Sequence, residues 1–427
     1  MRRSRPVPPP LGPALELVID RLGAQGDGVA QGPSGRPVYV PFALPGARVR
    51  ARLAGDRAAE VEVLAPSPER VAPSCPHFGV CGGCALQHWD AMPYLDWKAG
   101  KIAEILKLNR IEAEVLPPVA SPPGSRRRLA LHARPGRGGE ARLGYKVRGA
   151  WALVDVEVCP IADPRLVQAF PALRRLAAAF LEHPRSAPTL HVTWTDAGLD
   201  VDVTGVERRT GGLSADGMMR AAEAAGAADM ARVTLAGEIV YQARQPSVRF
   251  GRAEVALPPA AFLQAVPEAE EAMAAFVCRA AEGASRVADL FCGVGTFALR
   301  LAERSVVLAA DSEAGAVQAL AAAVGRTPGL KTVRAEARDL FRRPVLAQEL
   351  KGIDVAVFDP PRAGAAAQAA EIAASAVPVA IGVSCNPATF GRDARLLVDA
   401  GFRLEQVLPV DQFLWSAHVE LVGVFRR

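Results

Sequence analysis

The chain has 427 residues, half of them hydrophobic, and a formal net charge of +5. A length of this order predicts about three domains with sizeable cores. No apolar run is long and clean enough to span a membrane, so we expect no membrane association. The start of the chain also lacks the apolar segment of a signal peptide, which favours a cytoplasmic protein with reduced thiols.

The N-terminal part is expected to begin with a disordered tail at residues 1–12, which are rich in arginine and proline. Residues 13–65 then show five short alternating stretches separated by glycine and proline turns. This pattern predicts a small OB-like β-barrel, an architecture that often binds nucleic acid. A generic β module would give the same pattern, so the residues alone leave both interpretations open.

Residues 66–257 form the predicted central domain. A linker at 66–73 leads to a loop rich in cysteine and glycine, and residues 94–109 have helical periodicity. We expect the helical segment near 91–116 to pack on the domain that follows. From about residue 117 onward, many short apolar stretches alternate with glycine and proline turns, which predicts a mixed β domain.

Four of the seven cysteines have the placement of metal ligands. Cys75, Cys81 and Cys84 lie on a glycine-rich loop, and Cys159 lies far downstream, followed by a proline. Such a four-thiolate set can hold zinc or an iron–sulfur cluster. The five residues between the first two cysteines and the Cys-Pro pair favour [4Fe–4S] over zinc. A disulfide framework fits less well, because one cysteine of the seven would remain unpaired.

Residues 258–427 alternate strand and helix patterns, which predicts a doubly wound, Rossmann-like α/β domain. Asp289 ends an apolar run shortly before Gly293 and Gly295. Glycines at such a turn let the backbone approach a ligand, because they have no side chain. The next predicted strand ends in Asp311, at a distance from the turn that suits hydrogen bonding to a ribose diol.

The glycine turn is shorter than a dinucleotide fingerprint, because Phe297 and Ala298 stand where its third glycine would fall. A short turn suits S-adenosylmethionine, which has no pyrophosphate to hold. A third predicted strand leads towards Asp339 at the same edge of the sheet. The sequence therefore predicts an S-adenosylmethionine site. The thiolate cluster lies far from it in sequence, unlike the open-iron cluster of radical enzymes, so we expect a structural or substrate-positioning role for the cluster.

Two polar clusters follow buried-type strands near the C-terminus. One is Asp359-Pro360-Pro361-Arg362, and the other is Ser384-Cys385-Asn386-Pro387. A thiol at the carboxyl end of such a strand is placed for covalent catalysis, whereas most free cysteines are small buried hydrophobes. Glu420 lies in the last apolar stretch. If Glu420 is buried among these residues, it has the raised pKa that suits a general base. The alternative is a glutamate at the strand end that faces solvent.

In combination these motifs resemble the bacterial RNA uracil-5-methyltransferase family, most closely its 23S ribosomal RNA members with an N-terminal TRAM domain and an iron–sulfur cluster. The resemblance covers nearly the whole chain, including the four cysteines, residues 289–297, the two C-terminal clusters and the closing His418-Val419-Glu420. It implies a TRAM domain at 13–65, a cluster-bearing central domain at 66–257 and a class I methyltransferase domain at 258–427.

Residue by residue, the resemblance implies that Cys385 is the nucleophile, Glu420 the base and the four remote thiolates the cluster ligands. Beside the two glycines and Asp339, further cofactor contacts fall on Gln264, Phe291, Thr296, Asp311 and Asp359. The chain departs from the family pattern at several positions. After Gln264 the family has Val-Asn, where this chain has Ala265-Val266. The family's Glu and Tyr are replaced here by Asp311 and Phe291, and its Pro and Thr by Leu414 and Ser416.

The implied reaction methylates carbon 5 of a uridine in 23S rRNA. Cys385 adds to carbon 6, carbon 5 takes a methyl group from S-adenosylmethionine, and Glu420 removes the carbon 5 proton before the thiol leaves. The target base must be unstacked to reach both groups. A tRNA uridine is the alternative substrate. An amino-methyltransferase is a further alternative, although Arg362 stands where such enzymes have an aromatic residue. We expect a monomer that binds RNA.

Overall fold

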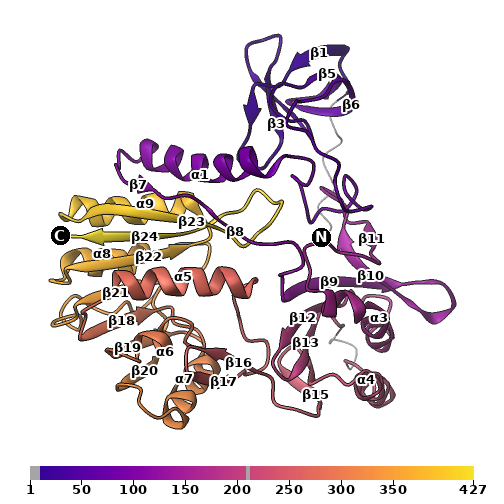
Figure 1. Cartoon of the computed structure of the whole chain (residues 1–427). Coiled ribbons are helices and arrows are strands. Elements are labelled where there is room, and N and C mark those ends of the chain that lie inside the picture. The colour runs from indigo at the N-terminus through magenta and orange to yellow at the C-terminus, as the bar shows by residue number, and fades with distance from the viewer. Residues whose placement is uncertain (1–9, 208–211) are drawn as a thin grey trace.

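The computed structural model describes residues 10–207 and 212–427, so the predicted disordered tail lies almost entirely outside the described residues. Figure 1 shows an N-terminal sheet, a central sheet with helices beside it, and a C-terminal α/β sheet. A long helix from the N-terminal half lies along the C-terminal sheet. In these described ranges, no helix combines the length and apolarity needed to cross a bilayer.

The N-terminal sheet has six strands in the order β1-β5-β6-β4-β3-β2, one more than the sequence predicts. They are β1 Ala14–Val18, β2 Arg21–Leu22, β3 Gly28–Gln31, β4 Pro37–Val40, β5 Arg48–Ala54 and β6 Arg57–Ala65. In β5, Val49 and Ala51 are buried, while Arg48, Arg50 and Arg52 on the other face are exposed. Close packing requires Gly28, because a Cβ there would lie 2.6 Å from the carbonyl oxygen of Ala43.

The central sheet has seven strands in the order β11-β10-β9-β12-β13-β14-β15. They are β9 Arg128–Pro135, β10 Ala141–Lys146, β11 Leu153–Asp155, β12 Thr189–Thr195, β13 Gly198–Thr204, β14 Arg232–Leu235 and β15 Glu238–Gln242. The sequence predicts these strands, but not the helices that share their core, α2 Pro164–Gln168, α3 Phe170–Ala179 and α4 Ala215–Ala227. A short 3-10 turn, Arg137–Gly139, and a hairpin of β16 Ser247–Phe250 and β17 Ala253–Ala256 complete this region.

The C-terminal sheet has nine strands, in the order β20-β19-β18-β21-β22-β24-β23-β7, with β8 also paired to β23. They are β7 Glu114–Val115, β8 Val119–Ala120, β18 Arg286–Leu290, β19 Val306–Asp311, β20 Val333–Ala337, β21 Val355–Phe358, β22 Val379–Ser384, β23 Arg403–Asp411 and β24 Glu420–Arg426. Strands β18 to β22 are parallel, and β24 runs antiparallel between β22 and β23. The predicted doubly wound α/β architecture is confirmed.

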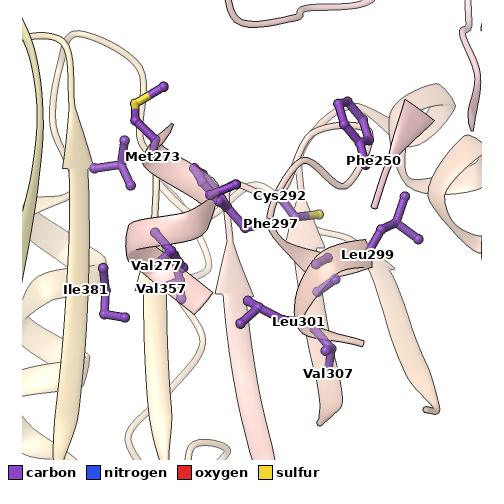
Figure 2. Close-up of a cluster of buried hydrophobic side chains, with 14 of the residues drawn as sticks. Phe250, Met273, Val277, Cys292, Phe297, Leu299, Leu301, Val307, Val357 and Ile381 are labelled. Atoms are coloured by element: carbon purple, nitrogen blue, oxygen red, sulfur yellow. The ribbon is translucent and has the colours of Figure 1, made fainter. Parts of the chain in front are cut away.

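Helices cover both faces of this sheet, so its central strands are buried throughout. The helices are α5 Pro267–Ala280, α6 Ala298–Leu301, α7 Ala314–Arg326, α8 Ala366–Ala374 and α9 Pro387–Asp399. On one face, Val357 and Ile381 belong to a hydrophobic core that also contains Met273 of α5 and Phe250 of the β16–β17 hairpin (Figure 2). Alternate residues of the same strands, such as Phe358, face a second core.

Helix α1, Ala91–Leu108, precedes the central sheet in sequence but packs on the C-terminal sheet. The side chain of Asp90 caps it by accepting a hydrogen bond from the backbone nitrogen of Met92. Ile102 and Leu106 enter the second core of the C-terminal sheet. The chain then adds β7 and β8 beside β23. The N-terminal half of the chain therefore supports the strand pair that carries Glu420.

Candidate active site

A glycine-containing turn follows the carboxyl end of β18. Phe291, Gly293 and Gly295 all have positive φ there. A Cβ on Gly295 would lie 2.6 Å from Leu320, so this position has room only for glycine. The backbone nitrogen of Gly293 donates to Asp311 at the end of β19 (2.9 Å). The glycine turn and Asp311, predicted as cofactor-site groups, therefore lie together at one edge of the sheet.

Three carboxylates meet at this edge. Asp289 is completely buried, and neither of its carboxylate oxygens has a hydrogen-bond partner among the described side-chain contacts. Burial, followed by the charges of Asp359 and Asp311, raises the pKa of Asp289 well above its ordinary value. Burial and Asp311 raise the pKa of Asp359 to about 7. Such a group of mutually repelling carboxylates favours a positively charged ligand.

An aromatic pair stands beside the turn. The ring centroids of Phe291 and Phe341 lie 5.6 Å apart, and about half of Phe341 is exposed. Asp339 holds this segment by accepting a hydrogen bond from the backbone nitrogen of Phe341 (3.0 Å). Thr296 follows the glycine turn and is partly buried. Phe341 is not among the residues that the sequence analysis selects, although an exposed aromatic two residues after a strand-end aspartate is a detectable signal.

Two side-chain amides connect Asp359 to Glu420. The Nε2 atom of Gln264 donates to Asp359 (3.2 Å), and its Oε1 atom accepts from Nε2 of Gln412 (2.8 Å). Nε2 of Gln412 also donates to Oε2 of Glu420 (2.5 Å). Both glutamines are buried. The sequence analysis selects Gln264 but misses Gln412, which carries no motif of its own.

The central sheet holds the loop that carries Gln264. The guanidinium of Arg127 donates to the carbonyl of Gln264 (3.1 Å) and to Glu270 (2.6 Å). Arg128 donates to the carbonyl of Leu263. Arg127 and Arg128 therefore tie the central sheet to the start of the C-terminal domain.

Cys385 lies one residue beyond the end of β22. In the β22–β24 ladder, Ser384 is paired with Leu421, so the next residues on the two strands are Cys385 and Glu420. Residues opposite each other on antiparallel strands have Cα atoms about 4.5–5.5 Å apart. Burial, followed by the charge of Glu420, raises the pKa of Cys385, and Arg362 acts in the opposite direction.

The two C-terminal motifs are hydrogen-bonded to each other. The side-chain amide of Asn386 donates to the carbonyl of Arg362 (3.1 Å), and its oxygen caps α9 by accepting from Ala388. Pro387 occupies the first turn of that helix. The flanks of Cys385 therefore fix the strand-to-helix turn that presents the thiol beside Arg362.

Glu420 is only 3% exposed. This burial fits the interpretation of Glu420 as a general base and does not fit a strand-end glutamate that faces solvent. Burial, followed by the charge of Asp359, raises its pKa to about 8. The hydrogen bond from Gln412 and the charge of Arg362 act in the opposite direction. A carboxyl group that titrates near neutral pH can both accept and release a proton during a reaction.

The four cysteines of the predicted cluster, Cys75, Cys81, Cys84 and Cys159, line one cavity of about 350 Å³. Arg362 and His418 line the same cavity, which therefore adjoins the Cys385 site. All seven cysteines are free thiols. Burial raises the pKa of Cys84 to about 12, with smaller contributions from the neighbouring cysteines. Among the described residues, no three His, Cys, Asp or Glu side chains are close enough to hold a single metal ion.

Comparison with known proteins decides the family. A family model for tRNA (uracil-5-)-methyltransferases matches residues 252–427. An uncharacterized RNA methyltransferase of Caulobacter vibrioides is 63% identical over 96% of this chain and 100% of its own. The 23S rRNA (uracil(1939)-C(5))-methyltransferase of Chromohalobacter salexigens is 34% identical over 96% of this chain and 89% of its own. The chain belongs to the RNA (uracil-5-)-methyltransferase family.

A solved structure shows the same fold. The tRNA (uracil-54, C5)-methyltransferase of Pyrococcus abyssi, in complex with S-adenosyl-L-homocysteine, superposes with a TM-score of 0.71 at 24% sequence identity. The match covers 96% of this chain and 99% of that enzyme. This RNA methyltransferase therefore has the S-adenosylmethionine-dependent class I fold, as the resemblance implied.

Proposed function

We propose that this enzyme methylates carbon 5 of a uridine in 23S ribosomal RNA through a covalent adduct with Cys385. The observation that carries this proposal is that Cys385 and the buried Glu420 both lie at the end of the β22–β24 ladder, next to the last paired residues Ser384 and Leu421. Both stand beside the carboxyl edge of the sheet, where the glycine turn and Asp311 lie. Covalent activation of a uracil ring requires a thiol and a base that can reach the same ring.

In the proposed reaction, the Cys385 sulfur forms a bond to carbon 6 of uracil, and the electron pair of the 5,6 double bond moves towards carbon 5. S-adenosylmethionine supplies the methyl group to carbon 5 when it is bound. Glu420 then accepts the carbon 5 proton, and the electron pair of that C–H bond restores the double bond as the C6–S bond breaks. Arg362 favours the thiolate, because its positive charge lowers the pKa of Cys385.

The proposed cofactor contacts lie near the carboxyl ends of β18, β19 and β21. Asp311, fixed by Gly293 and by the backbone of Glu313, is placed to accept hydrogen bonds from ribose hydroxyls. The buried carboxylates offset the positive charge of the cofactor. The remaining proposed contacts are Gln264, Phe291, Gly295, Thr296 and Asp339, and the exposed Phe341 joins them beside Phe291.

We further propose that the four cysteines hold a [4Fe–4S] cluster. The four thiols line one cavity, and the five-residue spacing of the first two cysteines and the Cys-Pro pair favour a cluster over a zinc ion. The Nε2 atom of His77, which lines the same cavity, is buried and has no hydrogen-bond partner in the described structure. These features fit a cluster of several atoms. A reducing cytoplasm would keep its cysteine ligands from forming disulfides.

The proposed RNA-binding part comprises a TRAM domain at 13–65 and the central domain at 66–257. Asp27 of the N-terminal sheet is buried and forms ion pairs with Arg57 and with Arg148 (2.7 Å), which follows β10. The guanidinium of Arg148 also lies 5.1 Å from the ring centroid of Phe42. Val147, the residue before Arg148, forms an isolated antiparallel β-bridge with Cys81. The N-terminal sheet is therefore docked beside the cysteine loop, next to the proposed target site.

The target RNA is tested by mapping 5-methyluridine in ribosomal and transfer RNA from a strain that lacks the gene. We expect the modification to disappear from one 23S rRNA position and to return with the wild-type gene but not with Cys385→Ala. Loss from transfer RNA would instead support the tRNA alternative, which the matching family model and the Pyrococcus abyssi structure favour. Loss of an N-methylated base would support an amino-methyltransferase and overturn the proposal.

A further inference from the structure

Gln412 lies between Gln264, a proposed cofactor contact, and Glu420, the proposed base. It follows the last residue of β23 and is only 2% exposed. Its Oε1 atom accepts a hydrogen bond from the backbone nitrogen of Ala265 (3.0 Å). Its Nε2 atom donates to Gln264 (2.8 Å) and to Glu420 (2.5 Å). Both ends of this buried amide are therefore satisfied by named partners.

These contacts determine which way the amide of Gln412 faces. A backbone N–H can only donate, so the group next to Ala265 must be the amide oxygen. The amide nitrogen is then left facing Gln264 and Glu420, each of which presents an oxygen. Turning the amide over would place two donors together at Ala265 and two acceptors together at Glu420. The direction of hydrogen bonding follows from the partners.

The backbone on both sides of Gln412 is also held in place. Val410 is paired with Glu420 across β23 and β24. Asp411, only 1% exposed, forms an ion pair with Lys98 of α1 and accepts a hydrogen bond from Tyr94 (2.7 Å). Helix α1 thus anchors the residue directly before Gln412. These contacts fix the backbone that carries the amide of Gln412, and a positioning residue requires such a fixed backbone.

We infer that Gln412 is a positioning residue for proton abstraction, which holds one oxygen of Glu420 and favours its ionised, proton-accepting form. This inference rests on the proposed function of Glu420. An N–H donor binds a carboxylate more strongly than a neutral carboxyl group. Among the described residues, Gln412 is the side chain that hydrogen-bonds this carboxyl group. The same amide orients Gln264, so it connects the base to a proposed cofactor contact.

The charged groups around Glu420 define the direction of the effect. Asp359 faces it from the end of β21 and raises its pKa, while Arg362 from the following loop lowers it. Cys385 lies in the turn after β22, and the charge of Glu420 raises the pKa of that thiol. The hydrogen bond from Gln412 lowers the pKa of Glu420. Removing this bond leaves burial and Asp359 opposed by Arg362 only, so the base should require a higher pH to ionise.

The test uses the full-length enzyme and a uridine-containing RNA substrate in single-turnover reactions between about pH 6 and pH 10.5. Gln412→Met removes the donor with little change in volume. The covalent protein–RNA intermediate is followed on denaturing gels, because its decay reports removal of the carbon 5 proton. Loss of a hydrogen bond to a charged group should move the pH dependence of decay upward by about one to two units. Gln348→Met, at an exposed position, is the matched control.

A slower decay at neutral pH that recovers at high pH would support the inference. Decay that is slowed equally at every pH would overturn it, because loss of packing alone does not move a titration. Gln412→Asn, which keeps the amide but shortens its reach, should show a displacement in the same direction and serves if Gln412→Met does not fold. The wild-type enzyme must also form a stable adduct with 5-fluorouridine RNA. Absence of that adduct would refute the proposed function itself, and this inference with it.

Discussion

Replacing Glu420 by glutamine should stabilise the protein at alkaline pH. The folded protein raises the pKa of this carboxyl group from 4.5 to about 8, mainly by burial and by the charge of Asp359. A folded state with the higher pKa binds the proton more tightly than the unfolded chain, so stability is greatest below the ordinary pKa and falls as pH rises towards 8. Glutamine keeps the oxygen that accepts the hydrogen bond from Gln412 but cannot ionise.

The size of the effect follows from the shift. At 1.36 kcal/mol per pH unit, a change from 4.5 to about 8 corresponds to a ceiling of about 4–5 kcal/mol. Part of this amount is repulsion from Asp359, whose own pKa is raised to about 7. For a unit of 150–250 residues, each kcal/mol moves the thermal midpoint by about 2–4 °C. We therefore expect an increase of about 10 °C for Glu420→Gln at pH 9, and almost none at pH 5.

Thermal unfolding followed by circular dichroism measures this difference at the two pH values and at fixed ionic strength. Glu112→Gln, at an exposed position, provides the control for loss of one negative charge. Equal gains for Glu420→Gln at pH 5 and pH 9 would show that the benefit does not come from ionisation. A loss of stability at pH 9 would refute the argument that the buried carboxylate costs folding free energy.

Three further changes have definite expected outcomes. Lys98→Met should destabilise the fold by about 3–5 kcal/mol, because it leaves the buried Asp411 unpaired, and Lys98→Met with Asp411→Asn should recover much of this loss in denaturant unfolding. Anaerobically purified wild-type protein should be brown and bind about four irons. Cys159→Ser should lose both properties and Cys278→Ser should keep them. Stoichiometric zinc in the wild type would contradict the proposed cluster. Asp311→Ala should weaken S-adenosylmethionine binding by about 1–3 kcal/mol in calorimetry, and unchanged affinity would remove Asp311 from the site.

The sequence predicts the catalytic sheet well because its signal is local. Strands such as β21 and β22 are continuous apolar runs that end in polar motifs, and parallel strands bring those motifs to one edge. Cys385, Asp359 and Asp311 could therefore be selected from short segments. Glu420 was recognisable for the same reason, as a carboxylate among apolar neighbours.

The elements that the sequence misses have weak or long-range signals. Helix α4 buries Ala221 and Ala225, whose small side chains give little hydrophobic contrast along the helix. Gln412 shows its importance only after folding, because its partners Ala265 and Gln264 lie about 150 residues upstream. Polar residues that act through tertiary hydrogen bonds leave no periodic pattern in the sequence.

The most direct test of the central claim is the fate of Cys385 with an RNA that contains 5-fluorouridine at the target position. Fluorine cannot leave as a cation, so the methylated adduct should be trapped on the wild-type enzyme, and peptide mapping should place the RNA on Cys385. Glu420→Gln should trap the same adduct on unmodified RNA, and Cys385→Ala should trap none. An RNA methylated at carbon 5 by Cys385→Ala, or an adduct mapped to another residue, would contradict the account.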